Sequence, residues 1–268
     1  MTFLSDFGLA DEYVAVCKAV IRSIAAEADV FDLTHLIRPF GVREGAAVLS
    51  ESVGWFPRAV HLAVVDPGVG SDRKAIVVSA GDALFVGPDN GLLLAAADRV
   101  GGVAGAWQIT NRDLGLPGRS STFHGRDVFA PAAAHLAGGA PPEVFGPPLE
   151  VVSLVRLPEP AVIEADGGYL GEIVLVDRFG NLQTSLTRRH VESLGLRAGN
   201  RAQVEVGNRT LGAVLRESYS YGSTGELQLI EDSHGSMALC VNLGSAAALL
   251  GHPALGSQIL LKRPPARQ

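Results

Sequence analysis

This 268-residue chain has little charge, little cysteine and no long apolar run. Charged residues make up 19% of it and apolar residues 47%, which argues against a disordered chain and predicts a sizeable packed core. The formal net charge of -6 lacks the basic footprint of a nucleic-acid-binding protein. The only cysteines, Cys17 and Cys240, lie far apart and have no CxxC partner. A disulfide framework or a cysteine-based zinc site is therefore not expected.

No apolar run approaches the roughly 20 residues that a membrane span needs. The first residues already form a predicted strand, Thr2–Ser5, so no signal peptide is expected. We therefore expect a soluble, cytoplasmic protein that binds neither membranes nor nucleic acid. The motifs GxxxxGK[ST], GxGxxG, HExxH and GxSxG are also absent, which speaks against a P-loop, a dinucleotide fold, a catalytic metal and a serine hydrolase.

Residues 1–154 are predicted to form an α/β domain with a largely parallel sheet. Apolar runs alternate with amphipathic segments along this half of the chain. The continuous run Val60–Val65 is typical of a strand buried on both faces of a parallel sheet. The predicted strands are Thr2–Ser5, Val30–Leu33, Val60–Val65, Ala75–Ser79 and Ala83–Val86, and the predicted helices are Asp11–Ala26, Arg43–Val53 and Asp127–Leu136.

Residues 155–168 are predicted to be a linker, because glycine and proline are frequent just before and within this range. Residues 169–268 then read as short strands separated by turn residues, with few helices between them. This pattern predicts an all-β domain, an antiparallel barrel. Its predicted strands are Leu170–Val176, Leu182–Ser185, Ala202–Val206, Thr210–Arg216, Leu227–Ile230, Met237–Val241 and Ile259–Leu261.

Several predicted strands of the first half end in polar clusters that contain glycine or proline. In open α/β sheets, ligands bind beyond the carboxyl ends of the strands, so these clusters predict a polar site. Any one of the carboxylates alone also fits a turn former or a helix cap. The clusters are Ser5–Gly8, Asp32–His35, Asp66–Ser71 and Pro88–Gly91.

His124 precedes a predicted helix and fits either a structural histidine or a group that orients a water beside Asp66 and Arg73. In the second half, Asp177–Asn181 interrupts two strands and fits either a turn or a ligand contact. Tyr219 and Tyr221 are candidates to stack on a base. The remaining histidines have no comparable partners in the sequence and are expected to be structural or surface groups; those considered are His35, His61, His135, His190 and His252.

Taken together, these segments resemble the S-adenosylmethionine hydroxide adenosyltransferases, which are relatives of the S-adenosylmethionine-dependent fluorinases and chlorinases. The resemblance runs in order along almost the whole chain. The matching segments are Ser5–Gly8, His35 with Pro39, Val65–Ser71 with Arg73, Pro88–Gly91, Ser121–Asp127, Asp177–Asn181, and Asn242 with Gly244–Ala246.

The resemblance implies that the chain hydrolyses S-adenosyl-L-methionine to adenosine and L-methionine, without a metal or other cofactor, by attack of water at the ribose C5′ carbon. It implies a catalytic trio of Asp66, Arg73 and His124. The implied substrate contacts are Asp6 at the ribose hydroxyls, Phe40 near the ligand, Phe179 and Tyr219 on the adenine faces, Asn181 at the adenine edge, backbone groups near Val241 and Leu243, and Asp177 and Ser233 at the methionine.

The resemblance also implies a homotrimer, with sites between the N-terminal domain of one copy and the C-terminal domain of its neighbour. Two positions depart from the family pattern. Ala238 stands where glutamate is frequent, and His234 stands where the halogenating relatives have arginine. The resemblance therefore does not say which groups hold the methionine carboxylate. Two alternatives also stay open, a halogenase that uses chloride or fluoride at C5′ and a protein that binds adenosine or S-adenosyl-L-methionine without turnover.

Overall fold

A computed structural model describes residues 1–118, 120–219 and 222–264. The chain divides into two compact units, Met1–Leu157 and Pro158–Gln268, called here the N-terminal and C-terminal units. The predicted linker, residues 155–168, stays a prediction, and a short strand, β7 (Ile163–Ala165), lies within that range. Tyr221 lies outside the described residues.

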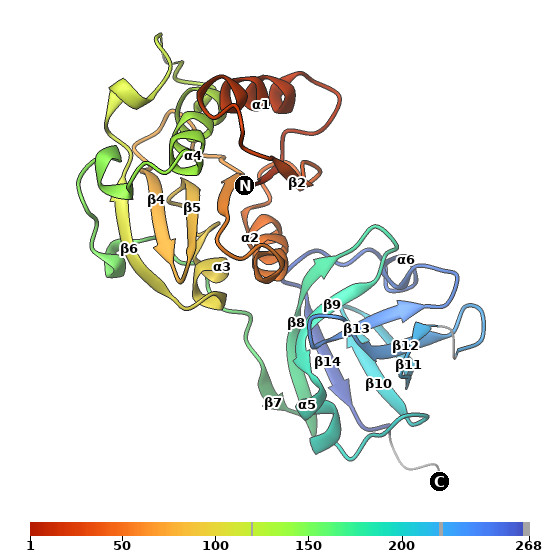
Figure 1. The fold of residues 1–268 in the computed structure, drawn as a ribbon. Helices are drawn as coiled ribbons and strands as arrows, with labels where there is room; N and C mark the ends of the chain where they lie inside the picture. Colours follow the sequence, from red (N-terminus) through yellow and green to blue (C-terminus); the bar gives the residue numbers. More distant parts are fainter. Residues whose placement is uncertain (119, 220–221, 265–268) are drawn as a thin grey trace. The chain divides into compact units, whose positions relative to one another are not determined.

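The N-terminal unit is built on a sheet whose strand order is β2-β1-β3-β5-β4-β6 in the described residues (Figure 1). The first four of these strands run parallel, whereas β4 is antiparallel to both of its neighbours. The predicted α/β unit with a largely parallel sheet is therefore confirmed. The strands are β1 (Thr2–Ser5), β2 (Phe31–Thr34), β3 (Val60–Val64), β4 (Ala75–Ala80), β5 (Ala83–Pro88) and β6 (Val103–Gln108).

Both faces of this sheet are covered, because successive residues of its strands point to opposite faces. On β1, Phe3 joins the core beneath one pair of helices and Leu4 joins the core beneath the other. Helices α1 and α4 pack on the first face, and α2 and α3 pack on the second (Figure 1). The helices are α1 (Tyr13–Ile24), α2 (Val42–Ser52), α3 (Leu94–Arg99) and α4 (Ala130–Ala137).

The C-terminal unit is a barrel. Within the described residues, seven strands close in the order β14-β10-β11-β12-β13-β9-β8, and β14 pairs back onto β8. Every neighbouring pair is antiparallel except β11–β12, so the predicted antiparallel barrel is confirmed. Its elements are β8 (Gly168–Val176), β9 (Leu182–Thr187), α5 (Arg188–Ser193), β10 (Arg201–Val206), β11 (Arg209–Leu215), β12 (Leu227–Glu231), β13 (Ser236–Val241), α6 (Ala246–Leu249) and β14 (Gln258–Lys262).

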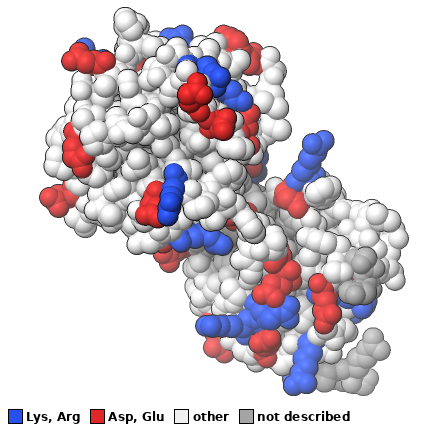
Figure 2. Space-filling view, viewed as in Figure 1, with Lys and Arg blue, Asp and Glu red and all other residues white. Residues whose placement is uncertain are grey.

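The surface carries charges of both signs. On the face drawn in Figure 2, basic and acidic side chains are interspersed, and most of the surface belongs to neither class. Over the described part of the chain, no helix is long and apolar enough to cross a membrane.

His61 is a fully buried histidine on β3. Its Nδ1 lies 2.8 Å from the Thr2 hydroxyl on β1, and its ring stacks on Phe85 with 4.9 Å between the centroids. Burial lowers the pKa of His61 to about 4, and the positive charge of the chain's amino terminus adds to this effect. The ring is therefore neutral in the folded protein at neutral pH.

The neutral state of His61 predicts acid sensitivity. Between pH 6.5 and pH 4 the unfolded chain takes up a proton at this residue that the folded chain does not, so stability falls as the pH falls. The free energy of unfolding is expected to decrease by roughly 3 kcal/mol over this window on account of His61 alone. Denaturant titrations of the wild type and of His61→Gln across this range measure the difference. Equal pH dependence in the two proteins would contradict the prediction.

Candidate active site

Polar residues follow the parallel strands of the N-terminal unit at one edge of the sheet. Asp6 follows β1, His35 follows β2, and Asp66 comes two residues after the end of β3. Because β2, β1 and β3 are neighbours and run in the same direction, these three positions lie along the same edge. This is the edge at which open α/β sheets bind their ligands.

Asp66, Arg73 and His124 form a connected cluster at this edge. The Arg73 Nε donates to both carboxylate oxygens of Asp66, at 2.9 and 3.0 Å, and Arg73 Nη2 also donates to Asp66. The same Nη2 lies 2.7 Å from Nδ1 of His124. The Arg73 guanidinium also lies over the Phe129 ring, 5.1 Å from its centroid. The side chains of Asp66 and Arg73 are 6% and 10% exposed, so solvent screens this pair weakly.

The contact with Arg73 fixes the tautomer of a neutral His124 ring. Arginine has donors only, so Nδ1 of His124 must accept the hydrogen bond from Arg73. A neutral His124 therefore carries its proton on Nε2 and can offer that group only as a donor. Asp66 is the member of the cluster that can accept a hydrogen bond from a water.

The loop that carries Arg73 is packed closely against the loop that carries His124. Gly70 has a φ of +79°, and a Cβ atom at this position would lie 2.7 Å from the Ser121 carbonyl oxygen. Within the first loop, the Ser71 hydroxyl donates to the Gly68 carbonyl at 2.6 Å and accepts from the Arg73 N–H at 3.3 Å. Glycine at position 70 therefore permits the approach that brings Arg73 to His124.

His124 stands at the start of a π-helix, η3 (Gly125–Phe129), which leads into α4. The buried Asp127 accepts a hydrogen bond from the Ser120 N–H at 2.7 Å and a fork of two from Arg126. Burial alone would raise the pKa of Asp127, but the hydrogen bonds from Arg126 and Ser120 lower it below its usual range. These contacts close the segment before the helix and hold His124 in place. The predicted helix Asp127–Leu136 is thus present, with a π-helical first turn.

Asp6 lies in the loop after β1, and its Oδ2 accepts the Phe40 N–H at 2.9 Å. Burial raises the pKa of Asp6, although the hydrogen bond from Phe40 acts in the opposite direction. Phe40 has a φ of +67° and an exposed side chain. A non-glycine residue in this conformation is strained, which is common in segments that hold ligands.

Asp89 and Asn90 follow β5 at the same edge, but their side chains form hydrogen bonds to backbone groups of the N-terminal unit. The buried Asp89 accepts the Val155 N–H at 2.9 Å. Asn90 donates to the Val65 carbonyl at 2.8 Å and accepts from the Leu92 N–H. This cluster therefore supports the loops of the edge through backbone contacts.

In the C-terminal unit, Asp177 and Asn181 build the turn between β8 and β9. Oδ1 of Asp177 accepts the N–H groups of Phe179 and Asn181, each at 2.9 Å, and Oδ2 accepts the Asn181 side-chain amide at 2.7 Å. The turn interpretation of this segment therefore holds. One N–H of the Asn181 side-chain amide is bonded to Asp177, so its second N–H can donate to a ligand and its carbonyl oxygen can accept from one. The ring of Phe179 is 76% exposed at the tip of the turn.

Val241 and Leu243 lie near this turn, because β13 pairs with β9 and the end of β13 lies beside the start of β9. The Leu243 side chain is 88% exposed with a φ of +54°, and Tyr219 is 48% exposed. Ser233 lies instead in the hairpin between β12 and β13, at the other end of these strands. The length of β13 separates it from Val241, roughly 15–20 Å at 3.3 Å per residue. Burial raises the pKa of Tyr219, and the charges of Cys240, Asp177 and Asp232 add to this effect, so Tyr219 lies within electrostatic reach of both the turn and the hairpin that carries Ser233.

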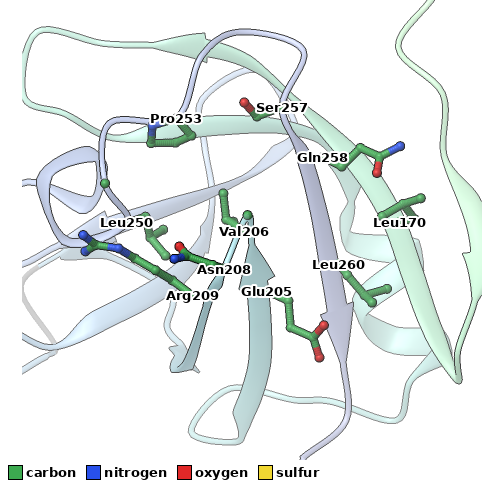
Figure 3. Close-up of a pocket in the computed structure, with 12 residues that line it drawn as sticks. Leu170, Glu205, Val206, Asn208, Arg209, Leu250, Pro253, Ser257, Gln258 and Leu260 are labelled. Carbon is green, nitrogen blue, oxygen red and sulfur yellow. The ribbon is translucent and has the colours of Figure 1, made fainter.

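The flank of the barrel carries a separate hollow of about 630 Å³ (Figure 3). The turn between β10 and β11 and the segment after α6 border it. In Figure 3 the side chains of Arg209, Glu205 and Gln258 point in different directions rather than toward one centre. Ligand sites have a few convergent polar groups, so this hollow is not a candidate site. Nor does the described sequence gather three or more His, Cys, Asp or Glu side chains as a metal centre would.

The whole arrangement matches one known family. Residues 1–146 match the SAM hydroxide adenosyltransferase N-terminal domain, and residues 171–256 match the C-terminal domain of the same family. The chain belongs to this family. The resemblance inferred from the sequence motifs is therefore confirmed.

Members of the SAM hydroxide adenosyltransferase family with assigned names are similar over nearly the whole chain. The (R)-S-adenosyl-L-methionine hydrolase of Salinispora tropica is 48% identical, with 94% of this chain and 93% of the relative covered. A fluorinase from Actinopolyspora mzabensis is more distant, at 28% identity over 92% of each chain. A crystal structure of an uncharacterized conserved protein from Thermotoga maritima superposes with a TM-score of 0.89 at 39% identity, over 97% of this chain and 99% of that one.

One contact at this edge of the sheet was not predicted from the sequence. His35 is buried and bonds to Ser5, although the sequence alone suggests no partner for it. The signal that could have found it is the parallel pairing of β1 and β2, which places the residues after the two strands side by side.

Proposed function

We propose that this chain cleaves S-adenosyl-L-methionine with water to give adenosine and L-methionine. The observation that carries the proposal is the Asp66–Arg73–His124 cluster at the ligand-binding edge of the sheet. The similarity to proteins named (R)-S-adenosyl-L-methionine hydrolase supports the choice of substrate.

The proposed reaction is a substitution at the ribose C5′ carbon. The water oxygen forms a bond to C5′, the C5′–S bond breaks, and its electron pair stays on sulfur, so methionine leaves as a neutral thioether. Asp66 accepts the hydrogen bond of the water and the proton that the water loses. Arg73 orients the carboxylate, and the Nε2–H of His124 offers a donor toward the developing hydroxide. Alignment of water, C5′ and sulfur supplies much of the remaining acceleration.

We assign the substrate contacts by the family pattern together with the exposed or ligand-accessible groups of each unit. No metal or cofactor has a part in this mechanism. Asp6 holds the ribose hydroxyls with Phe40 beside it, Phe179 and Tyr219 stack on adenine, Asn181 accepts from the adenine edge, the backbone near Val241 and Leu243 also reaches adenine, and Asp177 and Ser233 hold the methionine.

The experiment that tests this function is incubation of the purified chain with S-adenosyl-L-methionine, followed by chromatography. Adenosine and methionine in equal amounts are expected. A 5′-haloadenosine with methionine would instead identify a halogenase. Tight binding of adenosine with no product formed would identify a binding protein.

We also propose that the active protein is a homotrimer in the cytoplasm, in which the N-terminal unit of one copy and the C-terminal unit of a neighbour complete each site. This proposal is supported by the division of the assigned ligand contacts, since neither unit alone carries all of them. The reacting groups lie in the N-terminal unit, whereas the exposed aromatic Phe179 lies in the C-terminal unit.

The shared site predicts that two impaired variants restore each other's activity. Asp66→Asn damages only the N-terminal unit, and Phe179→Ala removes a base-stacking ring, a loss of about 5- to 150-fold at low substrate. In trimers refolded from an equal mixture, half of the units of each kind are intact, so about a quarter of the sites are whole. Activity of the mixture is compared with that of each variant refolded alone. No gain in the mixture would contradict a site shared between copies.

A further inference from the structure

Strand β1 bonds to two buried histidines, one near each end. At its start, Thr2 bonds to His61, and at its end the Ser5 hydroxyl lies 2.7 Å from Nδ1 of His35. Both histidines are less than 5% exposed. Only the second contact adjoins the ligand-binding edge, because Asp6 is the next residue after Ser5.

The far side of the His35 ring faces charge. Its Nε2 lies 3.1 Å from Oδ1 of Asp32, and Lys18 donates to Oδ2 of Asp32 at 2.6 Å. Burial alone would raise the pKa of Asp32, but Lys18 and His35 lower it below its usual range. The ring also meets Phe3 edge-on, with 4.6 Å between the centroids. His35 is thus held on three sides.

From this position His35 holds the loop that contains Asp6 at two points. Through its side chain it fixes the Ser5 hydroxyl, which accepts the Phe7 N–H at 3.3 Å. Through its backbone, the His35 carbonyl accepts the Gly8 N–H at 2.8 Å. Asp6 lies between these two anchors, so the direction of its carboxylate depends on them.

We propose that His35 is a positioning residue that aims the Asp6 carboxylate and thereby sets the selectivity of the site for a ribose that carries its 2′ and 3′ hydroxyls. The inference rests on the assignment of Asp6 to the ribose in the proposed function. A hydrogen bond to a charged group discriminates only when its geometry is held, so an Asp6 carboxylate that is displaced from this direction, with only the Phe40 N–H to hold it, loses most of its preference for the diol.

The test is binding of adenosine and of 2′,3′-dideoxyadenosine, measured by calorimetry, which requires no turnover. The wild type is expected to prefer adenosine by about 10- to 100-fold, the value of hydrogen bonds to a charged acceptor. In His35→Gln, whose amide can replace Nε2 but not Nδ1, the preference is expected to fall at least fivefold. His35→Asn, whose amide can replace Nδ1 and reach Ser5, is expected to keep more of it.

The matched control is His61→Gln, which removes the equivalent bond at the other end of β1. It is expected to lower stability and to leave the preference for adenosine unchanged. If His35→Gln does not fold, Ser5→Ala removes the same bond with little change in volume and is expected to lower the preference likewise. A preference retained by the folded His35 or Ser5 variant, or lost equally in His61→Gln, would overturn the inference. A wild type without any preference would overturn it together with the assignment of Asp6, while hydrolysis itself would still stand.

Discussion

Asp66→Asn is expected to reduce the turnover of S-adenosyl-L-methionine by about 100-fold or more. The substitution keeps the shape of the side chain but removes the charge that orients the attacking water, and lost acid–base assistance costs about 100- to 10,000-fold. The amide also places an N–H group against Arg73, whose guanidinium has donors only. The position of Arg73, and with it the hydrogen bond from Arg73 to His124, is therefore disturbed as well. Steady-state kinetics with adenosine detection measure the change.

Binding separates this effect from a general loss of structure. The affinity of Asp66→Asn for adenosine is expected to stay within a few-fold of the wild type, because the proposed mechanism places Asp66 at the reacting carbon rather than at the base. Asp72→Asn is the matched control, since it removes one exposed carboxylate from the same loop. Turnover of Asp66→Asn within a few-fold of Asp72→Asn would remove Asp66 from the mechanism.

Adenosine is expected to be the product even in high chloride or fluoride, with the oxygen of its 5′-hydroxyl drawn from solvent. A halide that takes the place of the water next to Asp66 meets a like charge. At an effective dielectric constant near 20, two unit charges about 4 Å apart repel by roughly 4 kcal/mol. Arg73 offsets part of this repulsion. Even half of it, about 2 kcal/mol, lowers the halide occupancy about 30-fold.

The guanidinium of Arg73 is also largely committed, because its Nε and Nη2 already bond to Asp66 and His124. A halide site needs donors to replace the water that the ion loses, whereas water gains an acceptor in Asp66 and pays no such penalty. The cluster therefore favours water over a halide as the nucleophile.

The measurement is the reaction in ¹⁸O-labelled water with added halide, followed by mass analysis of the nucleoside. Labelled adenosine is the expected product, and Asp66→Asn serves as the comparison, since the halide penalty is smaller there. Unlabelled adenosine, or a 5′-haloadenosine as the main product, would overturn the assignment of water and with it the role of Asp66.

The fold was predictable because its signals are local. The apolar run at Val60–Val65 predicts a strand buried on both faces, and β3 is such a strand. The short alternating strands of the second half likewise predict the barrel. Helix α3 and strand β6 were not predicted, since Leu94–Arg99 and Val103–Gln108 are short and their patterns are weak.

For the candidate site, the sequence by itself determined which carboxylates and loops stand at the strand ends, because the order of strands and turns follows from local patterns of apolar and polar residues. Only the tertiary structure decided how these loops meet. Arg73 and His124 are 51 residues apart, and their contact depends on Gly70 packing against the Ser121 carbonyl. The bond between Ser5 and His35 depends on the pairing of β1 with β2, and the place of Val241 beside the Asp177 turn depends on the register of β13 against β9. These are distances across the fold, set by packing and strand register, and no periodicity along the chain encodes them.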